Sequence, residues 1–414
     1  MRYIGIDFGT SNSLSCLAEN NKIRFVNYPD GSISNPTILY FPEKSKKSVI
    51  GSEAVGRYLA DLEESSAGGR LMLSIKTLLP DAKFDYTSVV GFGRLSAADL
   101  TAEFLSALKQ MAEQQFSQQF DGVVLGRPVE FSLLAVDRLE EAARTAGFKD
   151  VVFWLEPVAA AMAYEMTSTQ DELVCVIDIG GGTSDVCIIE TSPARILSPD
   201  RLSDIKSIAG VSEAGDELDS KIMKHKLACR FGAESTFASL GKTLPFPAHI
   251  INKLSKWHRI NLLNNHKDKE TIKSILPYSD NGEAVERLLD LINHHYGFQL
   301  FRAIDAAKKH LSKNRRASIK FNPLELDEEI TIAEFEEMIA STVRKIETSV
   351  LDALSKASAK SEDVKRVILT GGTSQVPFLN RLVVKMFGEE KIIRPDYFSS
   401  VATGLGFVAS RLNG

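Results

Sequence analysis

Two glycine-containing turns, each closely following an aspartate, carry the residues best suited to phosphate chemistry. Asp7 precedes Gly9, and Asp178 precedes the run Gly180, Gly181 and Gly182. Because glycine has no Cβ, it lets backbone N–H groups approach phosphate oxygens closely. The polar residues of the same turns, which add side-chain donors and acceptors, are Thr10, Ser11, Asn12 and Thr183. One such turn alone is usually only a hairpin, but two in equivalent places favour a phosphate-binding site.

The two aspartates by themselves would repel a bare phosphate group. A cation between the carboxylates and the phosphates removes this conflict. Mg²⁺ prefers oxygen ligands and keeps much of its water shell, so we expect Asp7 and Asp178 to hold it mostly through water. The two turns together therefore predict a site for a nucleotide with Mg²⁺.

A third glycine pair follows an apolar strand that ends near Leu369, and it precedes a helix that opens at Pro377. Free backbone amides at such a place suit a ribose, an adenine face or an α-phosphate. The loop consists of Gly371, Gly372, Thr373 and Ser374. A plain strand-to-helix turn is the alternative interpretation, because many α/β loops have this composition.

The elements that must position these turns alternate between strands and helices. Apolar runs predict strands over residues 3–6, 13–18, 123–125, 151–155, 173–177, 186–189 and 367–369. Helical spacing predicts helices over 99–119, 133–145 and 158–166, and a capping box at Thr331 and Glu334 opens another. Residues 29–69 are predicted as turns. The alternation indicates an α/β fold, and the repeated aspartate hairpin indicates an internal duplication.

Two duplicated α/β lobes with a cleft between them form the simplest architecture. Lobe I is expected over residues 1–170 and lobe II over residues 171–396, with a C-terminal helix over 397–414 that returns to lobe I. Residues from about 230 to 280 are less regular and locally basic. They are expected to form a solvated helical insertion, and a protein-docking surface is the alternative.

The composition is that of an ordinary folded protein. With 49 Lys and Arg against 54 Asp and Glu, the net charge of -5 gives no reason to expect a nucleic-acid or membrane partner. Four scattered cysteines without CxxC pairing indicate buried thiols in a reducing compartment, without a disulfide frame or zinc site. Asp7 comes too early for a signal peptide, and no apolar run approaches the roughly 20 residues of a bilayer span. A soluble, cytoplasmic protein is expected.

Four segments, in chain order, resemble motifs of the heat shock protein 70 (DnaK) family. Residues 4–13 (IGIDFGTSNS) are similar to its first phosphate loop, and residues 156–164 (EPVAAAMAY) to its connecting motif. Residues 176–185 (VIDIGGGTSD) resemble its second phosphate loop, and residues 371–377 (GGTSQVP) its adenosine loop. Residues 126–129 (GRPV) are most similar to the short YegD-type bacterial branch, and a peptide-binding domain is not expected past Gly414.

The resemblance implies a two-lobed, actin-like (ribonuclease H-like) ATPase fold with a central nucleotide cleft. It implies that Asp7 and Asp178 hold the water shell of Mg²⁺, that Glu156 positions water, and that Lys76 approaches the γ-phosphate. The remaining phosphate contacts would come from Thr10, Ser11 and Thr183 and from the amides of Gly181 and Gly182. Without the resemblance, Lys76 is interpreted as a surface lysine, and Glu156 as a carboxylate favoured by the positive end of a helix dipole.

The resemblance also implies an adenosine helix and a second glycine motif. The corresponding positions are Asp305, Lys308, Lys309 and Ser312 in the helix, and Gly215 and Asp216 in the glycine motif. Lys309 stands where the family has an arginine, whose flat guanidinium stacks on adenine as an ammonium does not. Ala214 replaces the first glycine, and its Cβ is expected to obstruct the nucleotide. Weaker adenine binding or altered base selectivity follows.

The function implied by the resemblance is ATP binding by a slow Mg²⁺-dependent ATPase that releases ADP and phosphate. Its role would be chaperone-related or regulatory and would involve protein partners, either co-chaperones or clients. Three alternatives use the same fold. They are an actin-like filament protein, a kinase of small molecules, and a sensor that binds ATP and barely turns it over.

Overall fold

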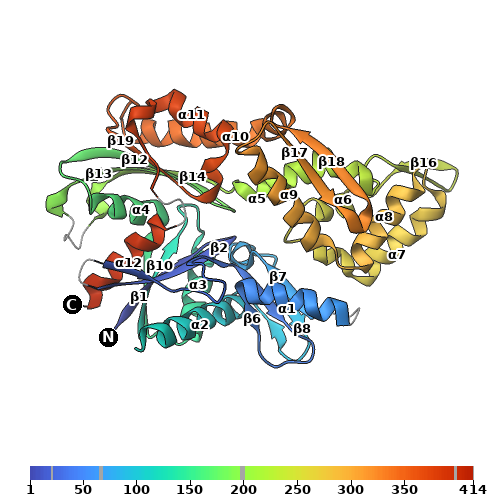
Figure 1. Cartoon of the computed structure of the whole chain (residues 1–414), viewed down its shortest axis with the longest axis horizontal. Helices are drawn as coiled ribbons and strands as arrows, with labels where there is room; N and C mark the ends of the chain where they lie inside the picture. The colour runs from blue at the N-terminus through green and yellow to red at the C-terminus, as the bar shows by residue number, and fades with distance from the viewer. Residues whose placement is uncertain (20–21, 65–68, 196–200, 396–398, 414) are drawn as a thin grey trace. The chain divides into compact units, whose positions relative to one another are not determined.

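The computed structural model describes residues 1–19, 22–64, 69–195, 201–395 and 399–413 (Figure 1). The chain divides into two compact units. The first comprises Met1–Ala214, Lys345–Ser374 and Leu379–Gly414, and the second comprises Gly215–Arg344 and Gln375–Phe378. The predicted lobe boundary between residues 396 and 397 lies outside the described residues, and the predicted lobe limits stay a prediction.

The first unit contains two sheets, each with a row of five neighbouring strands. The first row runs in the order β11-β10-β1-β2-β3. Its strands are β1 (Tyr3–Phe8), β2 (Asn12–Glu19), β3 (Lys22–Phe25), β10 (Gly122–Arg127) and β11 (Asp150–Leu155). β1, β10 and β11 are parallel, whereas β2 and β3 continue the sheet antiparallel.

The second row repeats this plan in the order β20-β19-β12-β13-β14. Its strands are β12 (Glu172–Ile179), β13 (Ser184–Thr191), β14 (Ile205–Val211), β19 (Arg366–Thr370) and β20 (Ile392–Ile393). Three strands are again parallel and two antiparallel, in the same sequence. Asp7 and Asp178 each occupy the last position but one of the equivalent strands β1 and β12. The predicted internal duplication is therefore confirmed.

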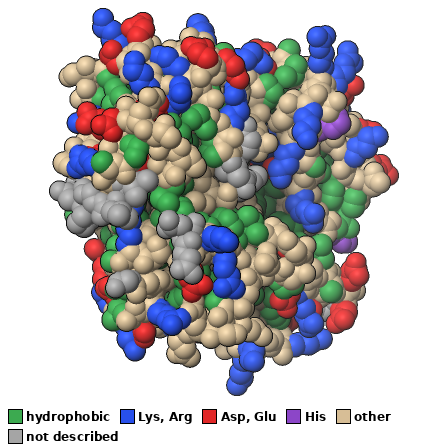
Figure 2. All heavy atoms as spheres, turned by 60° about the vertical axis from the view of Figure 1, so that its left-hand side comes forward, with side chains coloured by type: hydrophobic (Ala, Val, Ile, Leu, Met, Phe, Trp, Pro, Cys, Tyr) green, Lys and Arg blue, Asp and Glu red, His purple; other side chains and the backbone are tan. Residues whose placement is uncertain are grey.

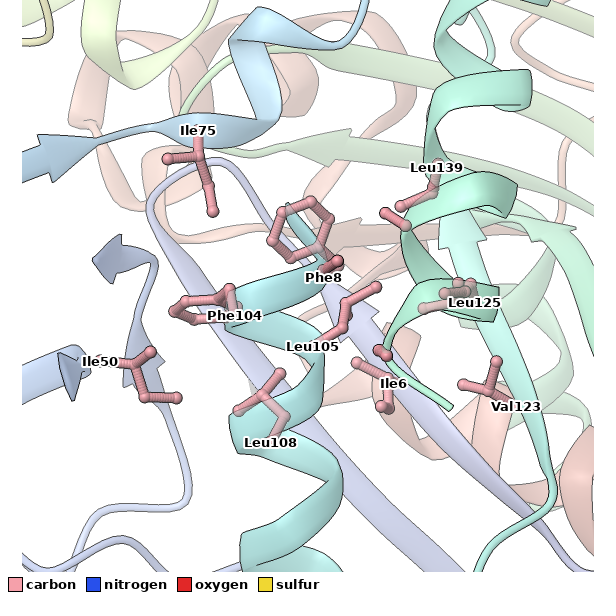
Figure 3. Close-up of a cluster of buried hydrophobic side chains, with 14 of the residues drawn as sticks. Ile6, Phe8, Ile50, Ile75, Phe104, Leu105, Leu108, Val123, Leu125 and Leu139 are labelled. Atoms are coloured by element: carbon pink, nitrogen blue, oxygen red, sulfur yellow. The ribbon is translucent and has the colours of Figure 1, made fainter. Parts of the chain in front are cut away.

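Strand alternation explains how both faces of the first sheet are covered. Ile4, Ile6 and Phe8 of β1 point into a core shared with α2 (Ala97–Phe116) and α3 (Leu133–Thr145), as Figure 3 shows for part of this core. Tyr3 points to the opposite core, which contains α4 (Glu156–Glu165) and α12 (Ser400–Asn413). In Figure 1 the red α12 lies beside the blue β1, and the two elements are in contact. Residues of β12, β13 and β19 join the same core, so α4 and α12 pack between the two sheets.

The prediction of turns throughout residues 29–69 was wrong. This stretch contains β4 (Asn35–Pro36), β5 (Ile38–Phe41), β6 (Val49–Ile50) and α1 (Gly51–Glu64), and β7 (Arg70–Leu73) follows. In α1 the buried residues after Gly51 are only Ala54 and Tyr58, four residues apart on one face. Val55, Tyr58, Leu59 and Leu62 nevertheless recur at helical spacing, so the sequence carried a periodic signal for this helix that the prediction missed.

The other predicted helices and strands are present, with ends shifted by a few residues. The remaining elements of the first unit are β8 (Thr87–Val89) and β9 (Gly93–Leu95). α10 (Ile332–Lys356) and α11 (Pro377–Phe387) each have residues in both units. The capping box of α10 is confirmed, because the Thr331 hydroxyl accepts from the Glu334 N–H and the Glu334 carboxylate accepts from the Thr331 N–H. All four cysteines are free, and three of them are buried.

The second unit is mainly helical. It contains α5 (Gly215–Ile222), α6 (Ala248–Leu254), α7 (His266–Ile275), α8 (Gly282–Asn293) and α9 (Gly297–Leu311). Two hairpins, β15 (Thr236–Ser239) with β16 (Lys242–Pro245) and β17 (Arg316–Phe321) with β18 (Leu326–Thr331), complete it. The segment expected to be a helical insertion thus contains α6 and α7, but the β15–β16 hairpin, whose second strand is exposed, precedes them.

The surface carries charges of both signs, and acidic and basic side chains are interspersed on the face shown in Figure 2. Among the described residues, the chain has no helix with the length and apolar character needed to cross a bilayer.

His258, which follows α6, gives a pH-dependent stability. Burial first, then the charges of Arg259 and Lys256, lower its pKa from 6.5 to about 4. The folded protein therefore favours the neutral imidazole. The resulting contribution to the free energy of unfolding is fully present above pH 6.5 and is lost as the pH falls toward 4. We expect wild-type protein to lose about 2 kcal/mol from this group between pH 7.5 and pH 5.

The measurement is urea unfolding at both pH values. His258→Gln should remove this part of the loss, whereas the matched variant His310→Gln, at an exposed position of α9, should keep it. Equal pH dependence in wild type and His258→Gln would contradict the assignment.

Candidate functional site

The two predicted phosphate turns meet in the first unit. A Cβ built on Gly182 would lie 2.6 Å from Thr10 Oγ1, so the second turn lies directly against the first. A Cβ on Gly9 would lie 2.1 Å from the carbonyl oxygen of Asn12, which explains why this turn requires glycine. The second turn is closed by the Gly180 N–H, which donates to the Thr183 carbonyl at 3.0 Å.

The third predicted loop joins the second turn. Gly371 has a φ of +81°, and a Cβ there would lie 2.2 Å from the Ile179 carbonyl oxygen and 2.6 Å from Asp178 Oδ1. The Thr373 hydroxyl donates to the Gly180 carbonyl at 2.6 Å. Because β19 runs parallel to β12, the carboxyl ends of both strands lie at one edge of the sheet, and this brings their loops together.

Lys76 is the cation of this site. It lies in the 3-10 turn Ile75–Leu78, only 3% exposed, and its Nζ donates to Glu156 Oε1 at 2.7 Å. Glu156 is the first residue of α4, directly after β11, and is itself buried. The Phe131 ring centroid lies 5.4 Å from Lys76 Nζ. The alternative interpretation of Lys76 as a surface lysine is therefore wrong.

Three further carboxylates lie near this ion pair, the buried Asp178 and Asp185 and the half-buried Asp7. Burial first, and then the charge of Glu156, raise the pKa of Asp7 to about 7, while Lys76 opposes the shift. Burial, Glu156, Asp185 and Asp7 together raise the pKa of Asp178 well above its ordinary value. Removing the aspartates from water and placing like charges nearby both favour the protonated form. If all four carboxylates were ionised, their charge would exceed the single positive charge of Lys76.

Asp185, at the end of the second phosphate loop, is a further acidic residue of the site, and no role was predicted for it. It lies opposite Asp178 in the β12–β13 ladder, and its Oδ1 accepts from the Val129 N–H at 2.7 Å. Burial and Glu156 raise its pKa to about 7, against hydrogen bonds from Val129 and Thr183. In the sequence, a charged residue directly before the apolar run Val186–Ile189 could have marked Asp185 as functional. Its hydrogen bond to the Val129 N–H could not have been predicted, because 56 residues separate the two.

The family model described as Hsp70 protein matches residues 3–236 and 286–414 of this chain, which is more than half of its length. The chain belongs to the Hsp70 family. It has the two-lobed, actin-like ATPase fold of that family, and it carries an Hsp70-type ATPase domain, which is a nucleotide-binding domain. Residues 237–285, which include most of the β15–β16 hairpin together with α6 and α7, lie outside the match.

The positions predicted for the Hsp70 adenosine helix and second glycine motif all belong to the second unit. Lys308 is half-buried between two carboxylates, with its Nζ 2.8 Å from Asp219 Oδ1 and 3.2 Å from Asp305 Oδ1. Burial by itself would lower the pKa of Lys308, but the two carboxylates raise it above its ordinary value. Lys309 is largely exposed and pairs with Asp305 at 2.7 Å. Ser312 Oγ is 3.5 Å from the Lys308 carbonyl.

Gly215 and Asp216 begin helix α5. The Asp216 carboxylate accepts from Trp257 Nε1 at 3.0 Å, and Trp257 comes from the segment outside the family match. Ala214, which takes the place of the first glycine, is buried. The predicted roles of these residues in nucleotide binding stay predictions.

The carboxylate set of the first unit fits a hydrated divalent cation. Three buried carboxylates and the half-buried Asp7 share the ammonium of Lys76, and a 2+ ion would offset their excess charge when all four are ionised. Within the described ranges, no three His, Cys, Asp or Glu side chains are grouped so as to hold a metal ion directly. An ion that keeps much of its water shell, as Mg²⁺ does, suits such a site.

Proposed function

We propose that this Hsp70 family member is a slow Mg²⁺-dependent ATPase that hydrolyses ATP to ADP and phosphate. The observation that carries the proposal is the buried Lys76–Glu156 ion pair, at 2.7 Å, among the carboxylates of Asp7, Asp178 and Asp185. Hydrolysis of a γ-phosphate needs positioning and charge neutralisation rather than covalent catalysis. A cation, several water-orienting carboxylates and glycine-rich turns are the groups that this chemistry requires.

Each part of the site has a separate task in this proposal. The Lys76 ammonium binds γ-phosphate oxygens, and the turns of Thr10, Thr183 and Gly182 bind phosphates through hydroxyl and N–H groups. Glu156 holds Lys76 and, with Asp178, orients the attacking water. Asp7 and Asp178 would hold Mg²⁺ through water, and the ion would neutralise charge on the phosphates. Burial keeps bulk water from screening these charges.

The adenosine end of the nucleotide is assigned on family resemblance. We propose contacts from the loop of Gly371, Gly372, Thr373 and Ser374, from Gly215 and Asp216, and from Asp305, Lys308, Lys309 and Ser312. Lys308 is already held by two carboxylates, so ribose hydroxyls would compete for Asp305 or share it. Because Lys309 cannot stack as arginine does, weak discrimination between adenine and guanine follows.

The cellular role that we propose is chaperone-related or regulatory, exerted through protein partners. The family supports this role in general terms. The actin-like filament, the small-molecule kinase and the ATP sensor remain the competing functions. Pelleting of the protein with ATP would favour the filament, and transfer of phosphate to a small molecule would favour the kinase.

Calorimetric titration of nucleotide-stripped protein with ATP, ADP and GTP, with and without Mg²⁺, tests the proposal, with phosphate release followed in the same samples. We expect Mg²⁺-dependent ATP binding and slow release of phosphate, both reduced in Lys76→Ala. Tight binding without phosphate release would favour the sensor. Failure to bind any of the three nucleotides would overturn the proposed function.

A further inference from the structure

Arg138 of α3 forms hydrogen bonds with the chain segment that follows Lys76. Its guanidinium donates to four backbone carbonyls, with Nη1 bonded to Leu78, Leu79 and Asp81 at 3.0–3.2 Å and Nη2 bonded to Phe84 at 3.2 Å. The planar guanidinium has five N–H donors and cannot be neutralised in a protein, so it can serve several carbonyls at once. No sequence motif drew attention to this residue.

The turn that carries Lys76 needs such support. It is a single 3-10 turn of four residues, Ile75–Leu78, and its Leu78 carbonyl is bonded outside the turn, to the Asp81 N–H at 3.3 Å as well as to Arg138. The preceding residue, Ser74, is fully buried and has a φ of +48°, a conformation that a residue with a side chain rarely adopts. A short turn with a strained entry keeps its place only if the surrounding structure fixes it, and Arg138 fixes the exit.

Arg138 also connects this turn to the other side of the site. The loop that leads into α3 contributes the Phe131 ring, which lies against Lys76, and the Val129 N–H, which binds Asp185. The turn of Lys76 and the loop of Phe131 are thus both attached to one helix. We propose that Arg138 is a positioning residue that sets the place of the Lys76 ammonium in the site. This proposal depends on the proposed function only where it predicts that Arg138 affects ATP turnover.

The test uses the full chain with Arg138→Gln and, as the charge-conserving variant, Arg138→Lys. The first readout is the rate at which an amine-reactive N-hydroxysuccinimide ester modifies Lys76, measured by mass spectrometry. Because Lys76 is buried and paired, we expect slow modification in wild type, about fivefold faster modification in Arg138→Gln, and an intermediate rate in Arg138→Lys. Continued protection of Cys175 and Cys187 from N-ethylmaleimide shows that the first unit stays folded.

The matched control is Arg144→Gln, since Arg144 is also on α3 but bonds to Glu140 and the Lys149 carbonyl. It should leave the Lys76 rate at the wild-type value. An unchanged Lys76 rate in folded Arg138→Gln overturns the proposal. If that variant does not fold, an unchanged rate in Arg138→Lys overturns it instead.

The second readout is ATP turnover. Arg138→Gln should lower kcat about 10-fold with KM within about twofold, and it should add no further loss in a Lys76→Ala background. An additional loss in that background would mean that Arg138 acts other than through Lys76 and would overturn the proposal. If wild type does not hydrolyse ATP, the proposed function fails, while the modification rate of Lys76 still decides the role of Arg138.

Discussion

Asp178→Asn is expected to slow ATP hydrolysis severely and, at the same time, to raise the melting temperature of the protein. Asp178 is buried with Glu156, Asp185 and Asp7 as like-charged neighbours, which together raise its pKa well above the ordinary value. A neutral amide of the same shape removes this repulsion, so the folded state gains stability. The same change removes a charge that would orient water and hold Mg²⁺, and kcat should fall about 100-fold or more.

The melting temperature is measured in EDTA at pH 8, where the carboxylates carry the most charge, and should rise by about 2 °C or more. Phosphate release with saturating ATP and Mg²⁺ gives kcat. Glu190→Gln on the neighbouring strand, whose exposed carboxylate pairs only with Lys206 among the described residues, should alter neither quantity appreciably. Full turnover in Asp178→Asn would remove Asp178 from the catalytic assignment.

Gly404→Ala should destabilise the protein and also reduce turnover. Gly404 lies in α12, and a Cβ there would meet the Ala159 carbonyl oxygen of α4 at 1.9 Å. A backbone atom cannot rotate away as a side chain does, so the two helices must separate. Overpacking costs about 1–3 kcal/mol, and we expect the upper end here because the obstacle is backbone, so the roughly 1 kcal/mol that alanine gains over glycine in a helix offsets only part of the cost. Because α4 begins with Glu156, its displacement also disturbs the partner of Lys76.

Gly56→Ala is the matched control for this prediction. Gly56 is likewise inside a helix, α1, but its missing Cβ would have nothing within 4 Å. It should therefore be neutral or stabilise by up to about 1 kcal/mol. Urea unfolding measures both variants. Equal stability of the two variants would show that the α12–α4 contact yields without cost.

The sequence predicted those features of the site that depend on local chemistry. The glycine turns after Asp7 and Asp178 need backbone freedom at fixed places, and the alternating strands that flank them give a periodic signal. Repetition of this pattern indicated the duplication, which the matching order of strands in both sheets confirms. The third glycine loop was predicted for the same reason, although its contact with Asp178 was not.

The sequence by itself therefore determined the family of this protein and the strands and turns that carry the three glycine loops, because these follow from residue types at short spacings. Only the tertiary structure decided which distant side chains share the buried space. It buried Lys76 against Glu156, 80 residues away, and placed Asp185 on the Val129 N–H. It also set Arg138 beneath the Lys76 turn and left room at Gly404 for the Ala159 backbone. Such pairings depend on how sheets and helices pack, and packing brings together residues that no short spacing connects.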